Sequence, residues 1–508
     1  TRMVKEKLIF GPPGCGKTYT LINVVRDALK KGTPPDRIGF VSFSRKSVEE
    51  ARSRVAAELN LTEEDTPWFR TLHSTGFQWL GFKKEQVMSK YDFGKIGNEV
   101  GLVFDNGTAR NIQDGLISVS AREGNKYLEI IHRSIMRCIS LGQQFNDTDD
   151  YNLHWVLLKK LEAVYKHYKK ENDKVDFTDM IKGFVDQGSS PSLDLLIVDE
   201  AQDLTPLQWE QVYVMKENAK EIWYAGDDDQ CIHRWNGVDV RDFINACDTI
   251  QILTQSHRVP TSVYSVANRI VKRISYRQEK DWKPLAKKGS VNYHLSLFDV
   301  NIDQGSWTIM ARTNRIVQTI AEGLRDDGYL YNLYGKPSLN QDMIKNMNTW
   351  ELLQNGSKLP LQMIKDLYAV LPKMGEKAKI KRGVVKQLDF LESDLILGYD
   401  DLVNNYGMIA PKDTTSRDML DVSKDDRFYM DSLTRRGEDF ESPRIDISTI
   451  HAMKGGEDDN VILMSESSRA CVKNQYQDDE HRVFYTGVTR TKENLHIIET
   501  ESENRYQI

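Results

Sequence analysis

The chain has 508 residues, of which 39% are hydrophobic and 28% charged, with 32 glycines and 14 prolines. This is the composition of an ordinary soluble globular protein, and it excludes collagenous and wholly disordered chains. At about 150 residues per domain, the length predicts three or four domains. Lys and Arg number 69 against 75 Asp and Glu, for a net charge of −6. A polyanionic partner would therefore be held by a local groove, not by a globally basic surface.

The sequence gives no sign of a membrane or secreted protein. It contains no run of 18 apolar residues, and its N-terminus lacks the apolar core of a signal peptide. The five cysteines form no CxxC pair, which excludes a zinc cluster and predicts no disulfide framework. We therefore expect a cytoplasmic or otherwise intracellular protein without a membrane partner.

The N-terminal part alternates strand and helix patterns. An apolar strand at 7–10 precedes a glycine-rich loop and a helix whose apolar residues share one face and which closes at Gly32. Further apolar strands are expected at 38–43, 193–198 and 222–225. This alternation predicts a parallel α/β sheet that binds its ligand at the carboxyl ends of the strands.

Two helical insertions and a second α/β set complete the organisation. Residues 81–175 are polar and helix-like, including a helix at 155–170. The second α/β set begins near 249–253, continues at 307–311 and resumes at 445–450, 461–464 and 495–498. We therefore predict a first α/β domain from 1–80 and 176–252 with insertion 81–175, and a second from 253–335 and 441–508 with insertion 336–440.

The loop between the first strand and helix has the spacing of a phosphate-binding loop. Its glycines let backbone N–H groups surround phosphates, Lys17 reaches the outer phosphates, and Thr18 offers its hydroxyl to Mg²⁺. The residues expected to bind ATP here are Gly11, Pro12, Pro13, Gly14, Cys15, Gly16, Lys17, Thr18 and Tyr19.

Two adjacent carboxylates follow the strand at 193–198. We assign Asp199 to Mg²⁺ and Glu200 to the attacking water, which it would orient and deprotonate. The next strand ends in Gly226 and a run of three aspartates before Gln230, with Trp235 five residues further on. A glutamine near the γ-phosphate, joined by a short turn to an exposed aromatic residue, can couple nucleotide state to a stacking base.

At this point the motifs resemble the superfamily 1A DNA helicases of the UvrD/Rep/PcrA type. The resemblance follows the family's motif order over most of the chain, and it implies two tandem RecA-like P-loop domains that enclose ATP while DNA runs across both. It places Arg258 and the arginine finger Arg490 on the γ-phosphate, together with the catalytic Gln230, and Glu457 near the nucleotide sugar. It implies DNA contacts by Phe43, His73, Trp235, Arg312, Asn314 and His451.

The chain departs from the family in three places. Residues 1–10 contain no glutamine to read adenine. His257 stands where an aromatic residue stacks on adenine, and His233 where a tyrosine faces DNA; imidazoles still stack, but more weakly. The insertion at 336–440 is short, yet it carries a basic cluster that either contacts duplex phosphates or is a solvated face: Lys373, Lys377, Lys379, Lys381, Arg382 and Lys386.

Other interpretations exist for several of these residues. Trp235 and Phe43 fit core aromatics, the three arginines fit surface ion pairs, and His73 and His451 fit structural histidines.

The sequence as a whole predicts an ATP- and Mg²⁺-dependent DNA helicase that moves 3′ to 5′ on single strands and unwinds duplex. We expect a monomer that binds single-stranded DNA and single-strand/duplex junctions, with replication or repair proteins as further partners. Two alternatives are a P-loop switch ATPase that is not coupled to DNA and a DNA-stimulated remodeller that strips proteins with little unwinding.

Overall fold

The fold is taken from a computed structural model that describes residues 4–59, 61–105, 122–148, 152–472 and 477–508. The chain divides into two compact units. Unit 1 takes in residues 1–290 and 473–492 with Ile508, and unit 2 takes in residues 291–472 and 493–507. Within the described ranges, no helix is both long and apolar enough to cross a membrane.

Unit 1 is built on a six-stranded sheet whose neighbouring strands all pair in parallel. Its strands, in spatial order, are β3 (Phe69–Thr71), β2 (Ile38–Ser42), β4 (Leu193–Asp199), β5 (Ala219–Gly226), β1 (Lys5–Phe10) and β6 (Ile250–Ile252). The register pairs Ser42 with Asp199 and Phe10 with Gly226. The carboxyl ends of four central strands therefore meet at one edge, where parallel sheets hold ligands.

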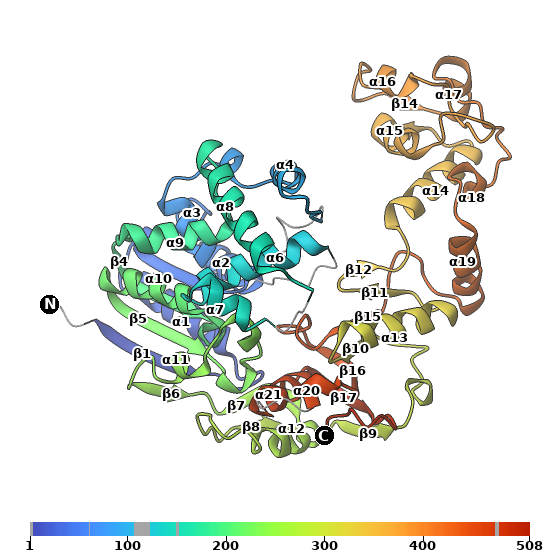
Figure 1. The fold of residues 1–508 in the computed structure, drawn as a ribbon. Coiled ribbons are helices and arrows are strands. Elements are labelled where there is room, and N and C mark those ends of the chain that lie inside the picture. Colours follow the sequence, from blue (N-terminus) through green and yellow to red (C-terminus); the bar gives the residue numbers. More distant parts are fainter. Residues whose placement is uncertain (1–3, 60, 106–121, 149–151, 473–476) are drawn as a thin grey trace. The chain divides into compact units, whose positions relative to one another are not determined.

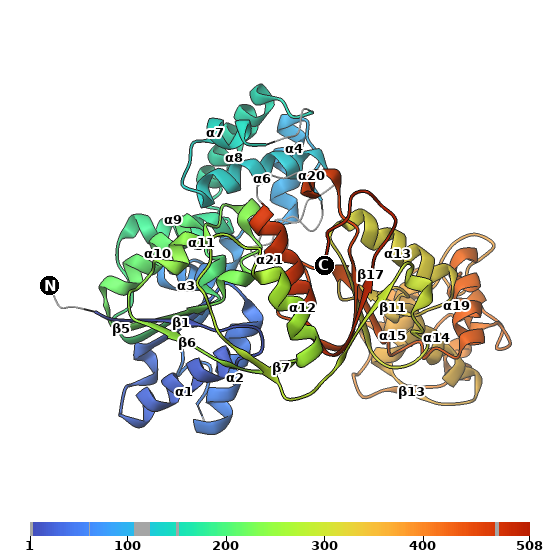
Figure 2. The same ribbon diagram turned by 90° about the horizontal axis from the view of Figure 1, so that it is seen from below.

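Helices cover both faces of this sheet, as Figure 2 shows. On one face, α1 (Lys17–Lys30) and α2 (Arg45–Leu59) pack Leu21, Val25 and Val48 against the strands. The other face is covered by α3 (Leu72–Trp79), α9 (Phe177–Gln187), α10 (Pro206–Glu217) and α11 (Val240–Ile244). Burial on both faces explains why parts of the central strands are apolar runs without alternation, such as Leu8–Phe10 and Leu195–Val198.

One strand belongs to a different sheet than its position in the sequence suggested. The segment 249–253, expected to open the second α/β set, is β6 and pairs with β1 of the first sheet. Backbone hydrogen bonds fix it there, from Leu8 N to Thr249 O and from Leu253 N to Phe10 O, both 2.9 Å. The apolar run predicts a strand correctly but cannot indicate which sheet edge it completes, because edge pairing is a non-local choice.

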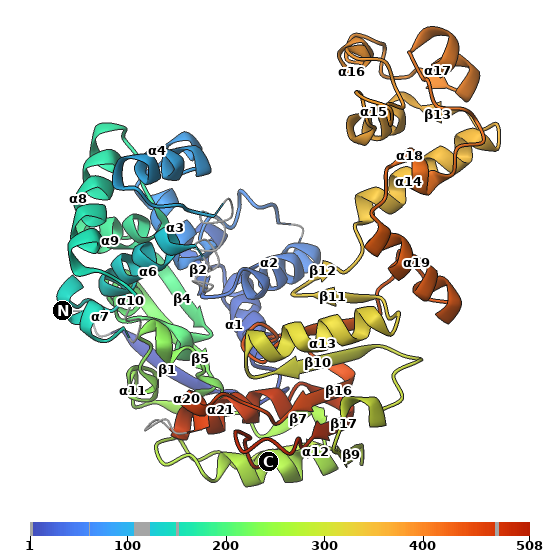
Figure 3. The ribbon, with the colours of Figure 1, turned by 45° about the vertical axis from the view of Figure 1, so that its right-hand side comes forward.

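The first insertion is helical, as expected. It comprises α4 (Lys90–Val100), α6 (Glu123–Met136), α7 (Leu141–Asn146) and α8 (Trp155–Glu171) (Figure 3). Tyr127, Leu158, Leu161 and Tyr165 are buried in a core of their own. Residues 106–121 and 149–151 of this insertion lie outside the described residues.

Four further elements of unit 1 follow the first sheet or come from near the C-terminus. They are β7 (Gln255–Pro260), β8 (Lys283–Leu285), α12 (Thr261–Val271) and α21 (Gln477–Val488). β7 and β8 pair in parallel with each other, and α12 contacts α21.

Unit 2 contains a seven-stranded sheet in the order β12 (Lys336–Pro337), β11 (Tyr331–Leu333), β15 (Ile445–Thr449), β10 (Trp307–Ala311), β16 (Asp458–Met464), β17 (Thr491–Ile498) and β9 (Ser290–His294). The central strands β11, β15, β10 and β16 are parallel, and β12 is antiparallel to β11. Helix α13 (Asn314–Asp326) packs Ile316, Val317 and Ile320 against this sheet.

Residues 336–440 form the helical part of unit 2 (Figure 1). Two cores, around Trp350 and around Tyr429, hold α14 (Gln341–Gln354), α15 (Leu361–Val370), α16 (Val384–Leu388), α17 (Tyr399–Asn405), α18 (Ser416–Met419), α19 (Lys424–Arg436) and the short pair β13 (Leu359–Pro360) and β14 (Ile396–Leu397). The predicted class, two α/β sheets each with a mainly helical insertion, is confirmed.

We expect Gly76→Ala to destabilise unit 1. A Cβ at Gly76 in α3 would lie 2.2 Å from the carbonyl oxygen of Met180 in α9. Because two backbones must separate to admit it, we expect a loss of ~1–3 kcal/mol in the free energy of unfolding. Gly94→Ala in α4, where nothing lies within 4 Å, is the matched control and should be neutral or stabilising by ~0.5–1 kcal/mol. Urea denaturation of both variants tests this; equal stabilities would contradict the close approach.

Candidate functional site

The loop between β1 and α1 has the backbone of a phosphate-binding loop. Gly14 and Gly16 have φ of +71° and +72°, in the left-handed region that favours glycine. Gly16 is the N-cap of α1, so the unpaired N–H groups of the first helical turn open onto this loop. Cys15 is buried, and burial raises the pKa of its thiol to about 12, so it stays neutral. Tyr19 is exposed.

Lys17 lies against the two carboxylates at the carboxyl end of β4, Asp199 and Glu200. Its Nζ is 2.6 Å from Glu200 Oε1 and 3.7 Å from Asp199 Oδ1. Burial alone would lower the pKa of Lys17, but Glu200 and Asp199 outweigh it and raise that pKa. Glu200 has φ +52°, an uncommon value for a side-chain-bearing residue, so the turn after β4 is under local strain.

Asp199 has the environment of a cation ligand. Its side chain is fully buried, and burial raises its pKa to about 6, against the opposing effect of Lys17. Its Oδ2 atom accepts no hydrogen bond within the described part of the chain. A buried carboxylate oxygen without a donor fits a hard cation such as Mg²⁺, which takes oxygen ligands. Thr18 is the second residue of α1, directly after Lys17, and so lies next to the loop.

Gln202 joins the turn after β4 to the turn after β5. Its Nε2 donates to Glu200 Oε2 at 2.6 Å, and its Oε1 accepts from the backbone N–H of Asp227 at 3.1 Å. A Cβ at Gly226 would lie 2.2 Å from this Oε1 atom. A side chain at position 226 would therefore break the link.

Gln230 continues this chain of hydrogen bonds. Its Nε2 donates to Asp227 Oδ2 at 2.6 Å, and its Oε1 accepts from Arg490 Nη2 at 2.5 Å. Arg490 is buried and follows α21. Two residues expected to act on the nucleotide, which are 260 positions apart in the sequence, are thus in direct contact.

The box on β7 docks onto the phosphate loop. Ser256 Oγ donates to Pro13 O at 2.7 Å, and the backbone N–H of His257 donates to Gly14 O at 2.9 Å. A Cβ at Gly14 would lie 2.5 Å from that of Arg258. The structure therefore brings Arg258 beside the loop, while the side chain of His257 is exposed.

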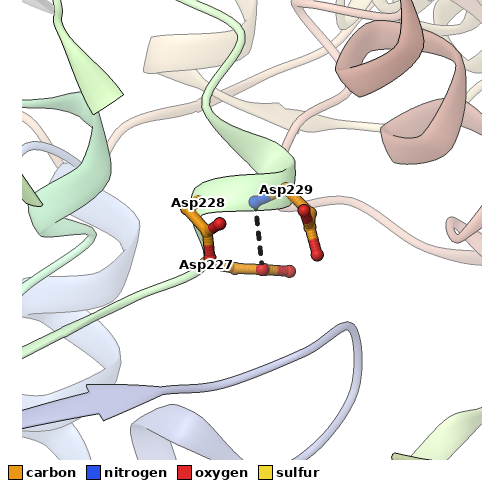
Figure 4. Close-up of side chains that lie close together, drawn as sticks. All are labelled: Asp227, Asp228 and Asp229. Atoms are coloured by element: carbon orange, nitrogen blue, oxygen red, sulfur yellow. Dashed lines mark hydrogen bonds between the residues drawn. The ribbon is translucent and has the colours of Figure 1, made fainter. Parts of the chain in front are cut away.

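Three consecutive aspartates after β5 form the one group in the described ranges with metal-ligand spacing (Figure 4). All three are buried. The ammonium of Lys280 already lies among them, 3.3 Å from Asp227 Oδ1, 2.8 Å from Asp229 Oδ2 and in close contact with Asp228 Oδ1. The cluster is therefore a buried ion-pair network whose cation is a side chain.

An aromatic row lies at the carboxyl ends of β2 and β5. The ring centroid of His233 is 5.7 Å from that of Phe43 and 6.1 Å from that of Trp235. His233 is buried, whereas Trp235 is 38% exposed. The guanidinium of Arg133 in α6 stacks on Trp235, 5.0 Å from its ring centroid. One aromatic residue of this row thus offers surface to a ligand.

His73 has different neighbours. Its ring packs edge-on against Phe177, with centroids 6.1 Å apart. Burial lowers the pKa of His73 to about 4, so the imidazole is neutral at physiological pH.

The candidate DNA residues of unit 2 gather at one edge of its sheet. Arg312 follows β10 and His451 lies just beyond β15, and these strands pair in parallel with Ala311 opposite Thr449. Asn314 begins α13 and accepts a hydrogen bond from Tyr334 Oη at 2.5 Å. Glu457 directly precedes β16 and so lies at the opposite, amino edge of the sheet.

The basic cluster of the second insertion lies in and around the segment between α15 and α16. Lys377 pairs with Asp421 at 2.7 Å. The exposed members are Lys377, Lys381, Arg382 and Lys386.

Sequence reasoning assigned no role to four residues of this site: Gln202, Arg277, Lys280 and Arg482. Gln202 contacts Glu200, and the other three contact the aspartates after β5; only the fold brings each of them there. The run of three aspartates after an apolar strand indicates that a cation is needed, because buried carboxylates require a counter-charge. Nothing in the nearby sequence identifies Lys280 as the residue that supplies it.

Comparison with known proteins gives the family. Residues 2–251 match the family model for the UvrD/REP helicase N-terminal domain, and residues 401–502 match that for the UvrD-like helicase C-terminal domain. The chain belongs to the UvrD-like helicase family, and its two α/β sheets are those of RecA-like domains. The resemblance drawn from the motifs is confirmed.

Relatives within the family are distant. The ATP-dependent DNA helicase PcrA of Bacillus subtilis is 23% identical over 65% of this chain and 48% of its own length. PcrA of Staphylococcus epidermidis is 20% identical over 96% of this chain and 80% of its own. The ATP-dependent DNA helicase Rep of Buchnera aphidicola is 23% identical over 52% and 40%, respectively. The chain thus spans about half the length of the first of these relatives.

We expect Glu200→Gln to lower the turnover number for ATP hydrolysis by about 10²- to 10⁴-fold, the usual contribution of a general base. The amide keeps the shape, and its oxygen still accepts from Lys17, but the group cannot accept a proton and no longer accepts from Gln202 Nε2 as well. Steady-state phosphate release measures turnover, and fluorescent-nucleotide titration should show ATP affinity within a few-fold of wild type. Glu210→Gln, at an exposed position of α10, is the control. Retained turnover would remove Glu200 from this role.

Proposed function

We propose that this protein is an ATP-dependent DNA helicase that translocates 3′ to 5′ on single-stranded DNA and unwinds duplex. The observation that carries the proposal is the hydrogen-bond chain from Lys17 through Glu200, Gln202, Asp227 and Gln230 to Arg490. It links the phosphate loop to the turn that also bears Trp235. The polarity rests on the family resemblance of the motifs.

Hydrolysis begins with competition for Lys17. The phosphates of ATP lie on the loop of Gly11, Gly14 and Gly16, and their charge draws the Lys17 ammonium away from Glu200. Glu200 then accepts a proton from the attacking water. Arg258 and Arg490 stabilise the charge that develops on the γ-phosphate, a contribution that can reach ~10³- to 10⁵-fold in rate for an arginine finger. Gln230 accepts a hydrogen bond from Arg490, so a movement of Arg490 toward that charge also moves or releases Gln230.

Mg²⁺ fits the site through Thr18 and Asp199. When bound, the ion neutralises charge on the β- and γ-phosphates. Asp199 supplies a buried carboxylate oxygen without another partner in the described chain, and Thr18 supplies a hydroxyl. His257 and Tyr19, both exposed, flank the base of the nucleotide, and the family resemblance of its motif assigns Glu457 to the nucleotide sugar.

Single-stranded DNA stacks on the aromatic row of unit 1. Trp235 offers the most exposed ring, next to His233 and Phe43, and base stacking on aromatics tolerates any sequence. Arg312, Asn314 and His451, gathered at one edge of the sheet of unit 2, hold DNA phosphates. The family resemblance of its motif also assigns a DNA contact to His73, which belongs to the first α/β domain. The exposed lysines and arginine between α15 and α16 face the duplex at a junction.

The domain bounds belong to the same proposal: 1–80 and 176–252 form the first motor domain, 253–335 and 441–508 the second, with insertions 81–175 and 336–440. We propose that the protein acts as a monomer inside the cell, together with replication or repair proteins.

The deciding experiment is steady-state ATP hydrolysis with and without single-stranded DNA. Wild type should be stimulated by DNA, and Lys17→Ala should lose hydrolysis because the phosphates lose their cation. Lys30→Ala, at the exposed far end of the same helix, should behave as wild type. Strand-displacement substrates with a 3′ or a 5′ tail then test polarity.

The alternatives give different results in the same assay. Lys17-dependent hydrolysis that ignores DNA would favour a switch ATPase. DNA-stimulated hydrolysis without unwinding of either tailed substrate would favour a protein-stripping remodeller.

We expect Trp235→Ala to weaken single-stranded DNA binding by ~1–3 kcal/mol, the value of one stacked base, which is about 5- to 150-fold in affinity. The DNA-stimulated rate of hydrolysis should fall more than the basal rate. Fluorescence anisotropy with labelled oligonucleotides measures the affinity. Trp155→Ala in α8, where the tryptophan is 41% exposed, is the matched control. An unchanged DNA affinity would return Trp235 to a structural role.

A further inference from the structure

The three aspartates after β5 share one cation with the geometry of a metal site. The Lys280 side chain is fully buried, and its ammonium contacts one oxygen of each of Asp227, Asp228 and Asp229. Burial alone would lower the pKa of Lys280, but the three carboxylates raise it above its usual value. The ammonium therefore remains charged, and the cluster has its cation built in.

Lys280 belongs to a segment that grips the aspartate loop at several points. This strap, residues 272–282, follows α12. Arg277 forms two parallel hydrogen bonds to Asp229, at 2.8 and 2.6 Å. The backbone N–H of Gln278 donates to Asp228 Oδ2 at 2.8 Å. From α21, Arg482 Nε donates to the carbonyl oxygen of Asp228 at 2.9 Å.

The aspartate loop that the strap holds leads to two residues of the proposed motor, Gln230 and Trp235. Asp227 contacts Lys280 through Oδ1 and accepts from Gln230 Nε2 through Oδ2. Gln230 in turn contacts Arg490, and Trp235 follows five residues later. A shift of the strap therefore moves Asp227, which orients Gln230, together with the backbone that leads to Trp235.

We propose that Lys280 is a positioning residue for nucleotide hydrolysis: its ammonium takes the place of a metal ion among Asp227, Asp228 and Asp229 and fixes the loop that bears Gln230 and Trp235. The inference rests on the proposed function for the reaction that it tunes. It predicts that the aspartate cluster binds no divalent cation while Lys280 is present.

The first test separates positioning from folding. Lys280→Met combined with Asp228→Asn removes one charge of each sign, so the net charge of the cluster is kept while its link is lost. We expect the turnover number for ATP hydrolysis to fall by about 10- to 100-fold, since displacement of a catalytic group by about 1 Å costs up to that much. KM for ATP should stay within a few-fold of wild type, and circular dichroism should show a folded protein.

Lys283→Met is the matched control, because Lys283 is exposed and lies three residues beyond Lys280. A double variant with wild-type turnover would overturn the proposal. So would a loss of turnover matched by an equal loss of nucleotide affinity, which would indicate a general disturbance of the site. If the double variant unfolds, Arg277→Gln supplies the same comparison, because Arg277 reaches the loop from its partly exposed end.

The second test needs no hydrolysis. Mn²⁺ binding without nucleotide is measured by electron paramagnetic resonance and by the rise in unfolding temperature. Wild type and Asp228→Asn should bind Mn²⁺ alike, whereas Lys280→Ala, which opens the ammonium's place, should gain an Mn²⁺-dependent rise in unfolding temperature. Wild-type Mn²⁺ binding that Asp228→Asn removes would overturn the proposal.

The two proposals fail in different ways. Hydrolysis by wild type that ignores DNA would refute the helicase proposal alone, because the Lys280 variants would still lower Lys17-dependent turnover and the Mn²⁺ comparison would stand. Wild-type turnover with normal DNA stimulation in the Lys280 double variant would refute the role of Lys280 alone.

Discussion

Burying several carboxylates at one sheet edge is the constraint on which this structure depends. The turns after β4 and β5 place Asp199, Asp227, Asp228 and Asp229 where each is at most 1% exposed. Unpaired charges are unstable when buried, because removing each ion from water costs roughly several kcal/mol even after the protein relaxes. Cations must therefore come from elsewhere in the chain. The proposed nucleotide site is assembled because remote segments supply these cations.

The two main cations differ in what they can exchange. Lys17 is 12% exposed and its partner Glu200 24%, so an incoming phosphate can reach and replace that partner. Lys280 and its three aspartates are closed to solvent. One ion pair is thus switchable and the other is permanent. The proposed motor needs both, because a ligand-dependent change is useful only when it acts against a part that stays fixed.

The sequence predicts what is locally encoded and misses what is not. Strands β1, β2, β4 and β5 and the phosphate loop follow from apolar runs and glycine spacing, and the carboxylates after β4 follow from their place at a strand end. The sheet joined by β6 and the partner of Asp228 do not follow, since Lys280 lies 52 residues away without any periodic signal. Exposure of Trp235 is likewise a property of the packed fold, because an aromatic residue in a turn suits core and surface equally.

Gln202 shows how strongly these contacts constrain a single side chain. Glu200 can only accept a hydrogen bond and the N–H of Asp227 can only donate one, so the residue between them must offer a donor and an acceptor at one planar group. An amide does so; a carboxylate would lose the donor and repel Glu200. The hydrogen bond from Gln202 also holds Glu200 itself, whose backbone has φ +52°. The close approach depends on a glycine, since a Cβ at Gly226 would lie 2.2 Å from the Oε1 atom of Gln202. Gln202 bonds both turns, so displacement of the turn after β5 is transmitted to Glu200.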